Sequence, residues 1–437
     1  MTLLIHNGRV MDPASGLDTM ADVAVQDGKI LAITPAGATP PAGFQAQHKL
    51  DATGCIVAPG LVDLQVRLRE PGHEHEGMLD SELKAAVAGG VTSLVCPPDT
   101  DPVLDEPGLV DMLKFRAERL HRARVFPLGA LTRQLKGDEL TEMAELTEAG
   151  CVGFSQAEVP LANTQVLQRA LQYAATYNYT VWLRPQELYL GKGVAASGPL
   201  ATRLGLSGVP VAAETIALHT IFALMRSTRA RVHLCRISSA EGVALVRAAK
   251  QEGLPVTADV SINSLHLSDH DIGYFDSRAR LTPVLRQPRD RDALRAALAD
   301  GTLDALVSDH TPIDIDGKTL PFAQAEPGAT GLELLLSLAI KWADETGAGL
   351  MRALDVLSAQ PAHVLCHSQQ VPSSVGRLSV GGVADVVVFQ PDAVWRVTPD
   401  QLHSQGKHTP FAYDMTGMSL PARVKATLVA GALAYQA

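Results

Sequence analysis

The sequence predicts an α/β protein that combines a (β/α)8 barrel of the TIM type with a small composite β-sandwich domain. Through the middle of the chain, short apolar segments alternate with helix-like segments, a pattern typical of parallel βα units. Both ends instead carry closely spaced short strands separated by glycine and proline. The 437 residues suffice for one large domain and a smaller one.

The two ends of the chain are expected to form the sandwich together. The predicted N-terminal strands lie in LLIHNGRVMDP, ADVAVQDGKILAI and CIVAPG, and the C-terminal ones in GRLSVGGVADVVVFQPD and ARVKATLVAGALAY. Asn7-Gly8 and Asp27-Gly28 are dipeptides typical of hairpin turns. We therefore assign residues 1–55 and 366–437 to the sandwich, and residues 56–365 to the barrel.

The barrel strands follow from eight short apolar segments. They are LVDLQV (61–66), TSLVCP (92–97), RVFPLGAL (124–131), CVGFSQ (151–156), TVWLRP (180–185), VHLCRI (232–237), PVTADV (255–260) and DALVSD (304–309). Helix-like segments such as GDELTEMAELTEAG and SAEGVALVRAAKQEG lie between them and end near a glycine that can serve as a C-cap.

Composition excludes several classes of function. The net charge of −10 gives no general basis for binding nucleic acid or an anionic membrane. The five cysteines are widely spaced and form no CxxC pair, which indicates reduced residues in a reducing compartment. The N-terminus lacks the pattern of a signal peptide, and the apolar stretches are short. We expect a soluble, cytoplasmic protein.

In a barrel of this kind the chemistry takes place at the carboxyl ends of the strands. The residues that the predicted strands place there are Gln65, Arg67, Asp99, Gln156, Arg184, Arg236, Asn263 and Asp309.

Several segments resemble a known family. PGLVDLQVRLREPG (59–72) is similar to the first-strand signature of the dihydroorotases, which belong to the amidohydrolase superfamily. The similarity continues in AVAGGVTSLVCPPDTDPV (86–103), DGTLDALVSDHTP (300–312) and GRLSVGGVADVVVFQPD (376–392), and covers nearly the whole chain. The resemblance implies the same barrel with a β-sandwich folded over it.

The resemblance also implies a pair of zinc ions, yet most of the ligand positions have changed. The family uses an HxH on strand 1, an acidic bridging ligand, one histidine each from strands 5 and 6, and an aspartate on strand 8. The matching positions hold Gln65 and Arg67, Gln156 and Ala157, Arg184, Arg236, and Asp309. Only the last keeps the family's residue type.

Arginine cannot replace these ligands. Zinc needs imidazole, thiolate or carboxylate donors, whereas a guanidinium group has no acceptor lone pair and stays protonated. We therefore expect the zinc site to be lost, with no metal and no other cofactor, and Asp309 to pair with Arg236 or Arg184. The three arginines either form part of a self-satisfied salt-bridge cluster or bind an anionic ligand such as a phosphate or dicarboxylate.

The positions that read the substrate have changed as well. Arg69 matches the arginine of the family's motif and can bind a carboxylate. Asp99 replaces the asparagine of the family's MPNT motif, and its charge would repel an acidic substrate. Thr282 replaces another expected asparagine, and SINSL (261–265) stands where the family has TPHHL. Because both the metal-ligand positions and the substrate-binding positions have changed, we expect that catalysis has been lost.

Four histidines offer other ligands. His73 and His75 form an HxH a few residues beyond the expected one, which is either a displaced metal site or part of an exposed loop. His233 and His310 are expected to be buried or hydrogen-bonded residues. The side chain of His310 should point away from that of Asp309, because neighbours on a strand face opposite sides.

Two functions from different classes remain. The first is a non-catalytic dihydroorotase homologue of pyrimidine biosynthesis. The resemblance implies that such metal-free chains assemble with the aspartate transcarbamoylase catalytic chain, in a homo-oligomer or hetero-oligomer. The second is an active dihydroorotase or related cyclic amidohydrolase with an altered metal centre. In that case Asp309 would be the surviving general base, contributing about 10²–10⁴-fold.

Overall fold

The computed structural model describes residues 2–412 and 417–437. It contains the predicted parallel barrel, and the expected fold class is confirmed. The barrel strands are β6 (Leu61–Asp63), β7 (Val91–Cys96), β8 (Arg124–Pro127) continued by β9 (Gly129–Ala130), β10 (Phe154–Ser155), β11 (Thr180–Leu183), β14 (Arg231–Leu234), β15 (Val256–Ser261) and β16 (Ala305–Val307). Each overlaps one of the segments predicted from the sequence.

Hydrogen bonding closes these strands into a ring. One sheet runs in the order β16-β15-β14-β11-β10-β9 and another in the order β6-β7-β8. A parallel bridge between Val66 and His310 joins the first strand to the last, and Arg67 N donates to His310 O at 2.9 Å. The carboxyl ends of all the strands therefore open on one face, as the chemistry of such barrels requires.

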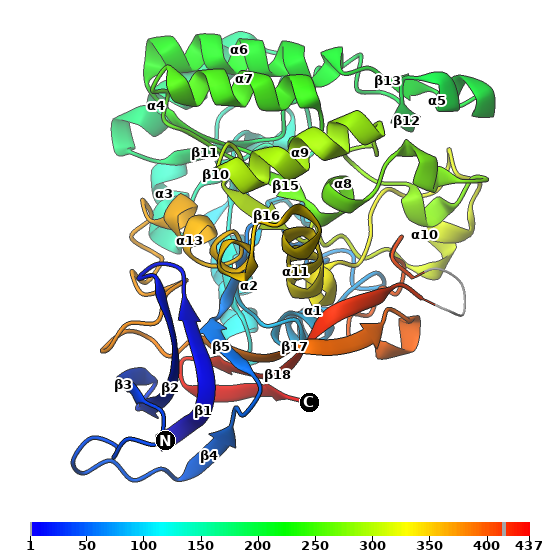
Figure 1. Cartoon of the computed structure of the whole chain (residues 1–437). Helices are drawn as coiled ribbons and strands as arrows, with labels where there is room; N and C mark the ends of the chain where they lie inside the picture. The colour runs from blue at the N-terminus through cyan, green and yellow to red at the C-terminus, as the bar shows by residue number, and fades with distance from the viewer. Residues whose placement is uncertain (1, 413–416) are drawn as a thin grey trace.

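A helix follows each barrel strand and covers its outer side (Figure 1). These helices are α1 (Leu79–Ala88), α2 (Pro107–Glu118), α3 (Met143–Ala149), α4 (Thr164–Tyr177), α6 (Ala212–Thr228), α7 (Ala240–Gln251), α9 (Pro288–Asp300) and α11 (Leu335–Thr346). Shorter elements join them: α5 (Pro199–Leu204), α8 (Ile262–His266), α10 (Ile315–Thr319), α12 (Leu350–Asp355), α13 (Ala359–Leu365), and the strand pair β12 (Ala195–Ala196) and β13 (Gly208–Val209).

Helix α4 illustrates how the sequence sets these boundaries. Asn163 caps the helix, because its side chain accepts from the backbone N–H groups of Gln165 and Val166. Asn178 ends it in the left-handed conformation, with φ of 62°. Its buried residues, which repeat at helical spacing and face the barrel, are Val166, Leu167, Ala170, Leu171 and Ala174.

The two ends of the chain meet in one eight-stranded sheet, in the order β19-β18-β17-β5-β1-β2-β3, with β4 paired to β1. The strands are β1 (Thr2–Asp12), β2 (Leu17–Gln26), β3 (Lys29–Pro35), β4 (His48–Asp51), β5 (Ile56–Pro59), β17 (Val386–Arg396), β18 (Ser419–Val429) and β19 (Ala432–Gln436). Antiparallel pairing of β5 with β17 joins the N-terminal part to the C-terminal part. Figure 1 shows this sheet at one end of the barrel.

Two details of the sandwich differ from the sequence prediction. Asp27-Gly28 is the turn between β2 and β3, but Asn7-Gly8 lies inside β1 and forms an irregularity in its pairing with β2. Asn7 N donates to the Asp22 carboxylate, and a Cβ on Gly8 would lie 2.5 Å from Val57. This dipeptide therefore makes a bulge that permits close packing. Strand β5 also lies just beyond the predicted domain limit at residue 55.

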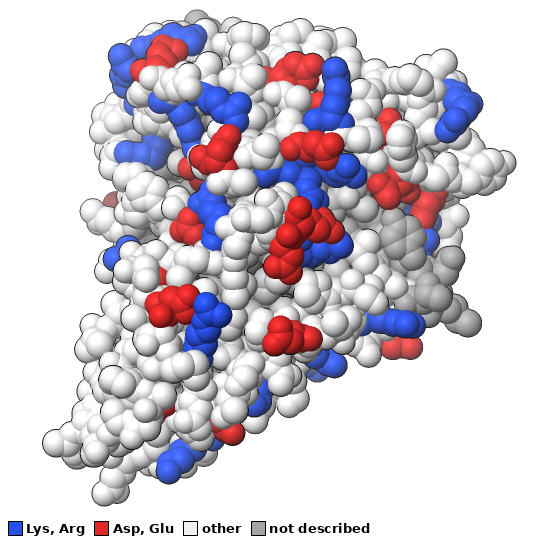
Figure 2. All heavy atoms as spheres, viewed as in Figure 1, with Lys and Arg blue, Asp and Glu red and all other residues white. Residues whose placement is uncertain are grey.

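Charges of both signs are interspersed on the face shown in Figure 2. Many arginine and lysine side chains of the protein pair with carboxylates. Arg295 and Lys341, for example, both contact Glu345. Among the residues described, no helix is long and apolar enough to cross a membrane.

Glu82 on α1 is expected to be a major source of stability for the barrel. Its carboxylate is fully buried and accepts hydrogen bonds from His310 Nε2 at 2.8 Å, Ser404 Oγ at 2.6 Å and Gln405 N at 2.9 Å. Glu82→Ala leaves these donors unpaired, so we expect the free energy of unfolding to fall by roughly 3–5 kcal/mol. Urea denaturation measures this loss.

Asp80 on the same helix is the matched control. Its side chain is 61% exposed and contacts Arg122 at 3.1 Å, and a pair this exposed contributes at most about 1 kcal/mol. Equal effects of Asp80→Ala and Glu82→Ala would contradict the role assigned to Glu82.

Candidate functional site at the barrel mouth

Three arginines converge at the mouth of the barrel, where the sequence predicts them. Arg184 follows β11 directly, Arg236 lies two residues beyond β14, and Arg67 lies beyond β6. The exposed fraction of each side chain is 9% or less. Burying three like charges together requires acidic partners close by.

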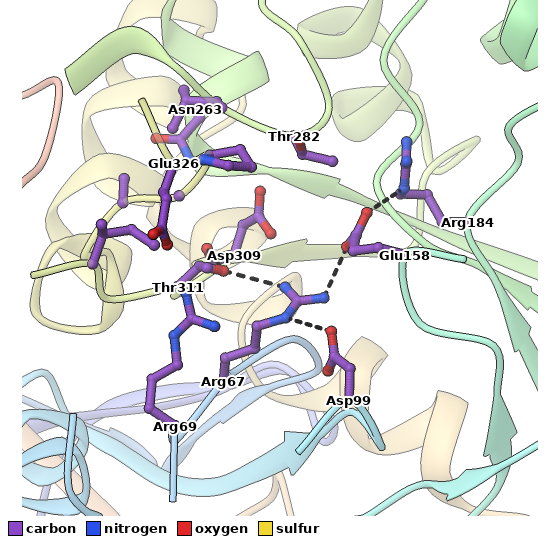
Figure 3. Close-up of a pocket in the computed structure, with 15 residues that line it drawn as sticks. Arg67, Arg69, Asp99, Glu158, Arg184, Asn263, Thr282, Asp309, Thr311 and Glu326 are labelled. Carbon is purple, nitrogen blue, oxygen red and sulfur yellow. Dashed lines mark hydrogen bonds and ion pairs between the residues drawn. The ribbon is translucent and has the colours of Figure 1, made fainter. Parts of the chain in front are cut away.

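Glu158 is the central partner, although the sequence did not single it out. Figure 3 shows its carboxylate between Arg67 and Arg184. Arg67 Nη2 donates to its Oε1 at 2.8 Å, and Arg236 Nη2 donates to the same oxygen. Arg184 Nε lies 2.5 Å from Oε2, as an ion pair without hydrogen-bond geometry. One carboxylate therefore contacts all three guanidinium groups.

The charge state of Glu158 follows from these contacts. Burial pushes the pKa of Glu158 up, but the charges of Arg236, Arg184 and Arg67 outweigh it and hold the pKa well below its ordinary value. The sequence held a signal for Glu158, because in FSQAE this residue directly follows Gln156 and Ala157, the two positions interpreted as lost metal ligands. Ala157 before it has a φ of 50°, in the left-handed region.

Two aspartates complete the cluster. Asp309 Oδ1 accepts from Arg236 Nη1 at 2.9 Å, which is one of the two pairings expected from the sequence. Asp99 Oδ2 accepts from Arg67 Nε at 2.9 Å, so its charge has a cationic partner. Burial raises the pKa of Asp309, although Arg236 and Arg67 act in the opposite direction. Three arginines thus face three carboxylates, which favours the self-satisfied cluster.

The remaining predicted positions lie around this cluster. Gln156 accepts from Thr132 Oγ1 at 3.0 Å and donates to Leu135 O at 2.7 Å. Gln65 is buried. Thr282 offers its carbonyl oxygen to Arg236 Nη1 at 3.2 Å.

Arg69 is engaged as well. Its Nε donates to Pro312 O at 2.8 Å and lies 3.0 Å from Glu76 Oε2. Burial lowers the pKa of Arg69.

A cavity of about 370 Å³ opens beside the cluster, large enough for a small organic molecule. It is lined by residues that include Arg67, Arg69, Asp99, Glu158, Arg184, Asn263, Thr282, Asp309 and Glu326. Among the described residues that line it, none is histidine or cysteine.

The donor set at the mouth does not fit a zinc pair. The guanidinium groups of Arg67, Arg184 and Arg236 have no lone pair for a metal and repel a cation. The carboxylates of Asp99, Glu158 and Asp309 are each paired with an arginine. A zinc ion here would have to break these pairs and then bind beside fixed positive charges.

Two histidines are fully buried and hydrogen-bonded, as predicted. His233 Nε2 lies 2.9 Å from Asp259 Oδ2, and its Nδ1 lies 2.8 Å from Thr257 Oγ1. His310 points away from the cluster, to Glu82 and to the backbone N–H of Gly331, which lies 3.1 Å from its Nδ1. Both rings position the strand ends beneath the mouth.

Comparison with known proteins shows similarity to dihydroorotase-like and other amidohydrolase proteins. A family model described as "Dihydro-orotase-like" matches residues 54–242, and one described as "Amidohydrolase family" matches residues 216–434. A "Dihydroorotase-like protein" of Pseudomonas aeruginosa is 43% identical over 437 residues, covering 100% of both chains. A "Dihydroorotase" of Geobacter sp. is 38% identical over 438 residues, again covering 100% of both.

Solved structures match the fold over the whole length. An L-hydantoinase (dihydropyrimidinase) from Arthrobacter aurescens superposes with a TM-score of 0.86 at 22% identity, covering 99% of this chain and 96% of that one. A dihydropyrimidinase from Brevibacillus agri gives a TM-score of 0.82 at 21% identity, covering 100% of this chain and 95% of that one.

Glu158→Gln tests the central role of this carboxylate. At neutral pH we expect the free energy of unfolding to fall by roughly 2–4 kcal/mol, less than for a fully buried pair because the side chain is 30% exposed. The folded-state pKa of Glu158 is lowered, so its stabilisation is present above the ordinary pKa of about 4.3 and lost as the pH falls through the folded value. The difference from wild type should therefore shrink below about pH 4. Urea titrations at a series of pH values measure it.

Glu139→Gln is the matched control. Glu139 is 74% exposed and lies 3.6 Å from Arg133, so we expect a change within about 0.5 kcal/mol. A difference between Glu158→Gln and wild type that stays constant down to pH 3 would contradict the assigned charge state.

Proposed function

Because the chain belongs to the dihydroorotase-like amidohydrolase family, we propose that it is a non-catalytic member of that family with a structural role in pyrimidine biosynthesis. Its role is to assemble with the catalytic chain of aspartate transcarbamoylase. The partner comes from the lineage that the sequence resembles, in which metal-free dihydroorotase-like chains are subunits of such assemblies.

One observation carries the non-catalytic part of the proposal. The guanidinium groups of Arg67, Arg184 and Arg236 occupy the mouth and are bound by Glu158. Hydrolysis of a cyclic amide by this family relies on metal-activated water, and bound zinc lowers the pKa of water to about 7. Arginines supply positive charge at the mouth but cannot bind and deprotonate water in this way.

A cyclic amide hydrolase with an altered centre is the second candidate. The cavity of about 370 Å³ beside Asp309 favours it, as do relatives named dihydroorotase. Asp309 as a lone general base would contribute about 10²–10⁴-fold, while enzymes reach about 10⁶–10¹⁷-fold. A rate limited in this way would be far below that of a metal-dependent enzyme.

A hydrolysis assay separates the two candidates. We expect the purified chain, with the affinity tag removed, to hydrolyse dihydroorotate no faster than a protein-free control, with or without added Zn²⁺. The Geobacter sp. relative named dihydroorotase serves as the positive control. Asp309→Asn identifies contamination, because turnover that belongs to this chain must fall in that variant. Clear turnover that is lost in Asp309→Asn would overturn the non-catalytic proposal.

Assembly is tested by co-expression with the aspartate transcarbamoylase catalytic chain of the same organism. We expect the two chains to co-elute in gel filtration, in a peak larger than either gives when expressed alone. Separate elution at micromolar concentrations of both chains would count against the assembly role.

A further inference from the structure

A group of side chains with donor atoms for a metal lies outside the arginine cluster, in the loop that follows β6. His73, His75 and Glu76 each offer one donor atom, and these three atoms all lie within 4.8 Å of one another. Both imidazole rings are accessible to solvent, whereas the Glu76 side chain is only 4% exposed. The sequence presented this HxH as either a ligand pair or an exposed loop, and the buried carboxylate is the additional donor that the fold supplies.

The loop is held in place by its backbone. Gln405 Nε2 donates to the carbonyl oxygens of Glu74 and His75, at 3.0 and 2.9 Å. His73 N donates to Arg69 O at 2.8 Å, and Glu76 N donates to His73 O at 2.9 Å. The backbone that presents the donors is therefore fixed on both sides, so binding need order only the two imidazole side chains.

We propose that His73, His75 and Glu76 bind a divalent transition-metal ion, with zinc as the ion best suited to them. Two imidazoles and one carboxylate form a common set of three protein ligands for zinc, and water takes the fourth position. This ligand set also suits Co²⁺ and Ni²⁺. The inference does not depend on the proposed function, because these residues lie outside the arginine cluster.

The geometry requires only small movements of the imidazoles. Ligand bonds of about 2.0–2.2 Å place the donors of a tetrahedral ion about 3.3–3.5 Å apart. His73 Nδ1 already lies 3.9 Å from Glu76 Oε2, and the two ring centroids are 6.1 Å apart. Rotation of the solvent-accessible imidazoles closes the remaining distance, while Glu76 provides the fixed point.

The local charges also permit a cation. The positive charge of Arg69 disfavours a bound cation, because its Nε lies 3.0 Å from Glu76 Oε2. The carboxyl group of Glu326 interacts electrostatically with that of Glu76, so a second acidic group faces the same place. Glu74 in the same loop accepts from Gly72 N at 3.1 Å. Carboxyl groups therefore outnumber the arginine here, whereas at the barrel mouth Asp99, Glu158 and Asp309 are each paired with a guanidinium group.

Calorimetric titration of the full-length, tag-free, chelator-treated chain with ZnCl₂ tests the site. We expect one equivalent to bind, and His73→Ala and His75→Ala each to weaken binding by more than about tenfold, since even the loss of an outer hydrogen bond to a zinc ligand costs about 10–100-fold. His270→Ala is the matched control, because His270 is 72% exposed and lies outside the group. Co²⁺ should give visible absorption that both loop variants lose.

The outcomes separate this site from the barrel mouth. No binding by the wild-type chain, or equal binding by a His73→Ala/His75→Ala double variant with native circular dichroism, would overturn the inference. Zinc bound by the loop without dihydroorotate turnover supports the inference and leaves the proposed function intact. If the double variant still binds zinc and hydrolyses dihydroorotate, both the inference and the proposed function are overturned.

Discussion

The contact of Glu158 with three arginines is the interaction on which the barrel mouth depends. Two unit charges 4 Å apart interact by about 4 kcal/mol at an effective dielectric constant of about 20, so three buried guanidinium groups alone would drive the strand ends apart. Glu158 contacts Arg67, Arg184 and Arg236, which come from three different strands. One side chain therefore ties together segments that are far apart in the sequence.

Strained backbone lies in the same place. Four non-glycine residues at or near the mouth have φ between 50° and 64°, namely Arg69, Ala157, Arg236 and Asp309. Conformations of this kind cost of order 1–3 kcal/mol each and persist where the surroundings hold them. Arg236 N donates to Asp259 Oδ1 at 2.7 Å, and the other oxygen of Asp259 binds His233. The buried histidine network thus supports the turn that presents an arginine to the mouth.

The sequence predicted the barrel because each strand carries its own local signal. It also predicted that Asp309 pairs with Arg236 or Arg184, since all three residues follow buried strands, and the structure shows the pair with Arg236. Glu158 was not predicted, although it directly follows the two lost-ligand positions of FSQAE, because its importance comes from arginines that follow other strands. Asn7-Gly8 was misassigned for a similar reason: the same dipeptide suits a hairpin or a bulge, and only packing against Val57 decides between them. The sequence likewise did not predict Glu76 as the third donor beside His73 and His75, because the burial of its carboxylate comes from the fold.

An arginine cluster and a zinc pair satisfy the same structural need in different ways. In each arrangement, side chains from several strands surround a group of opposite charge at the centre of the mouth. A zinc pair also provides an open coordination position and activated water, whereas the donors of a guanidinium group stay protonated. Here the ion pairs of Asp99, Glu158 and Asp309 with arginines hold the mouth together. A barrel held in this way keeps its shape and its outer surfaces, and these are the properties that the proposed assembly subunit requires.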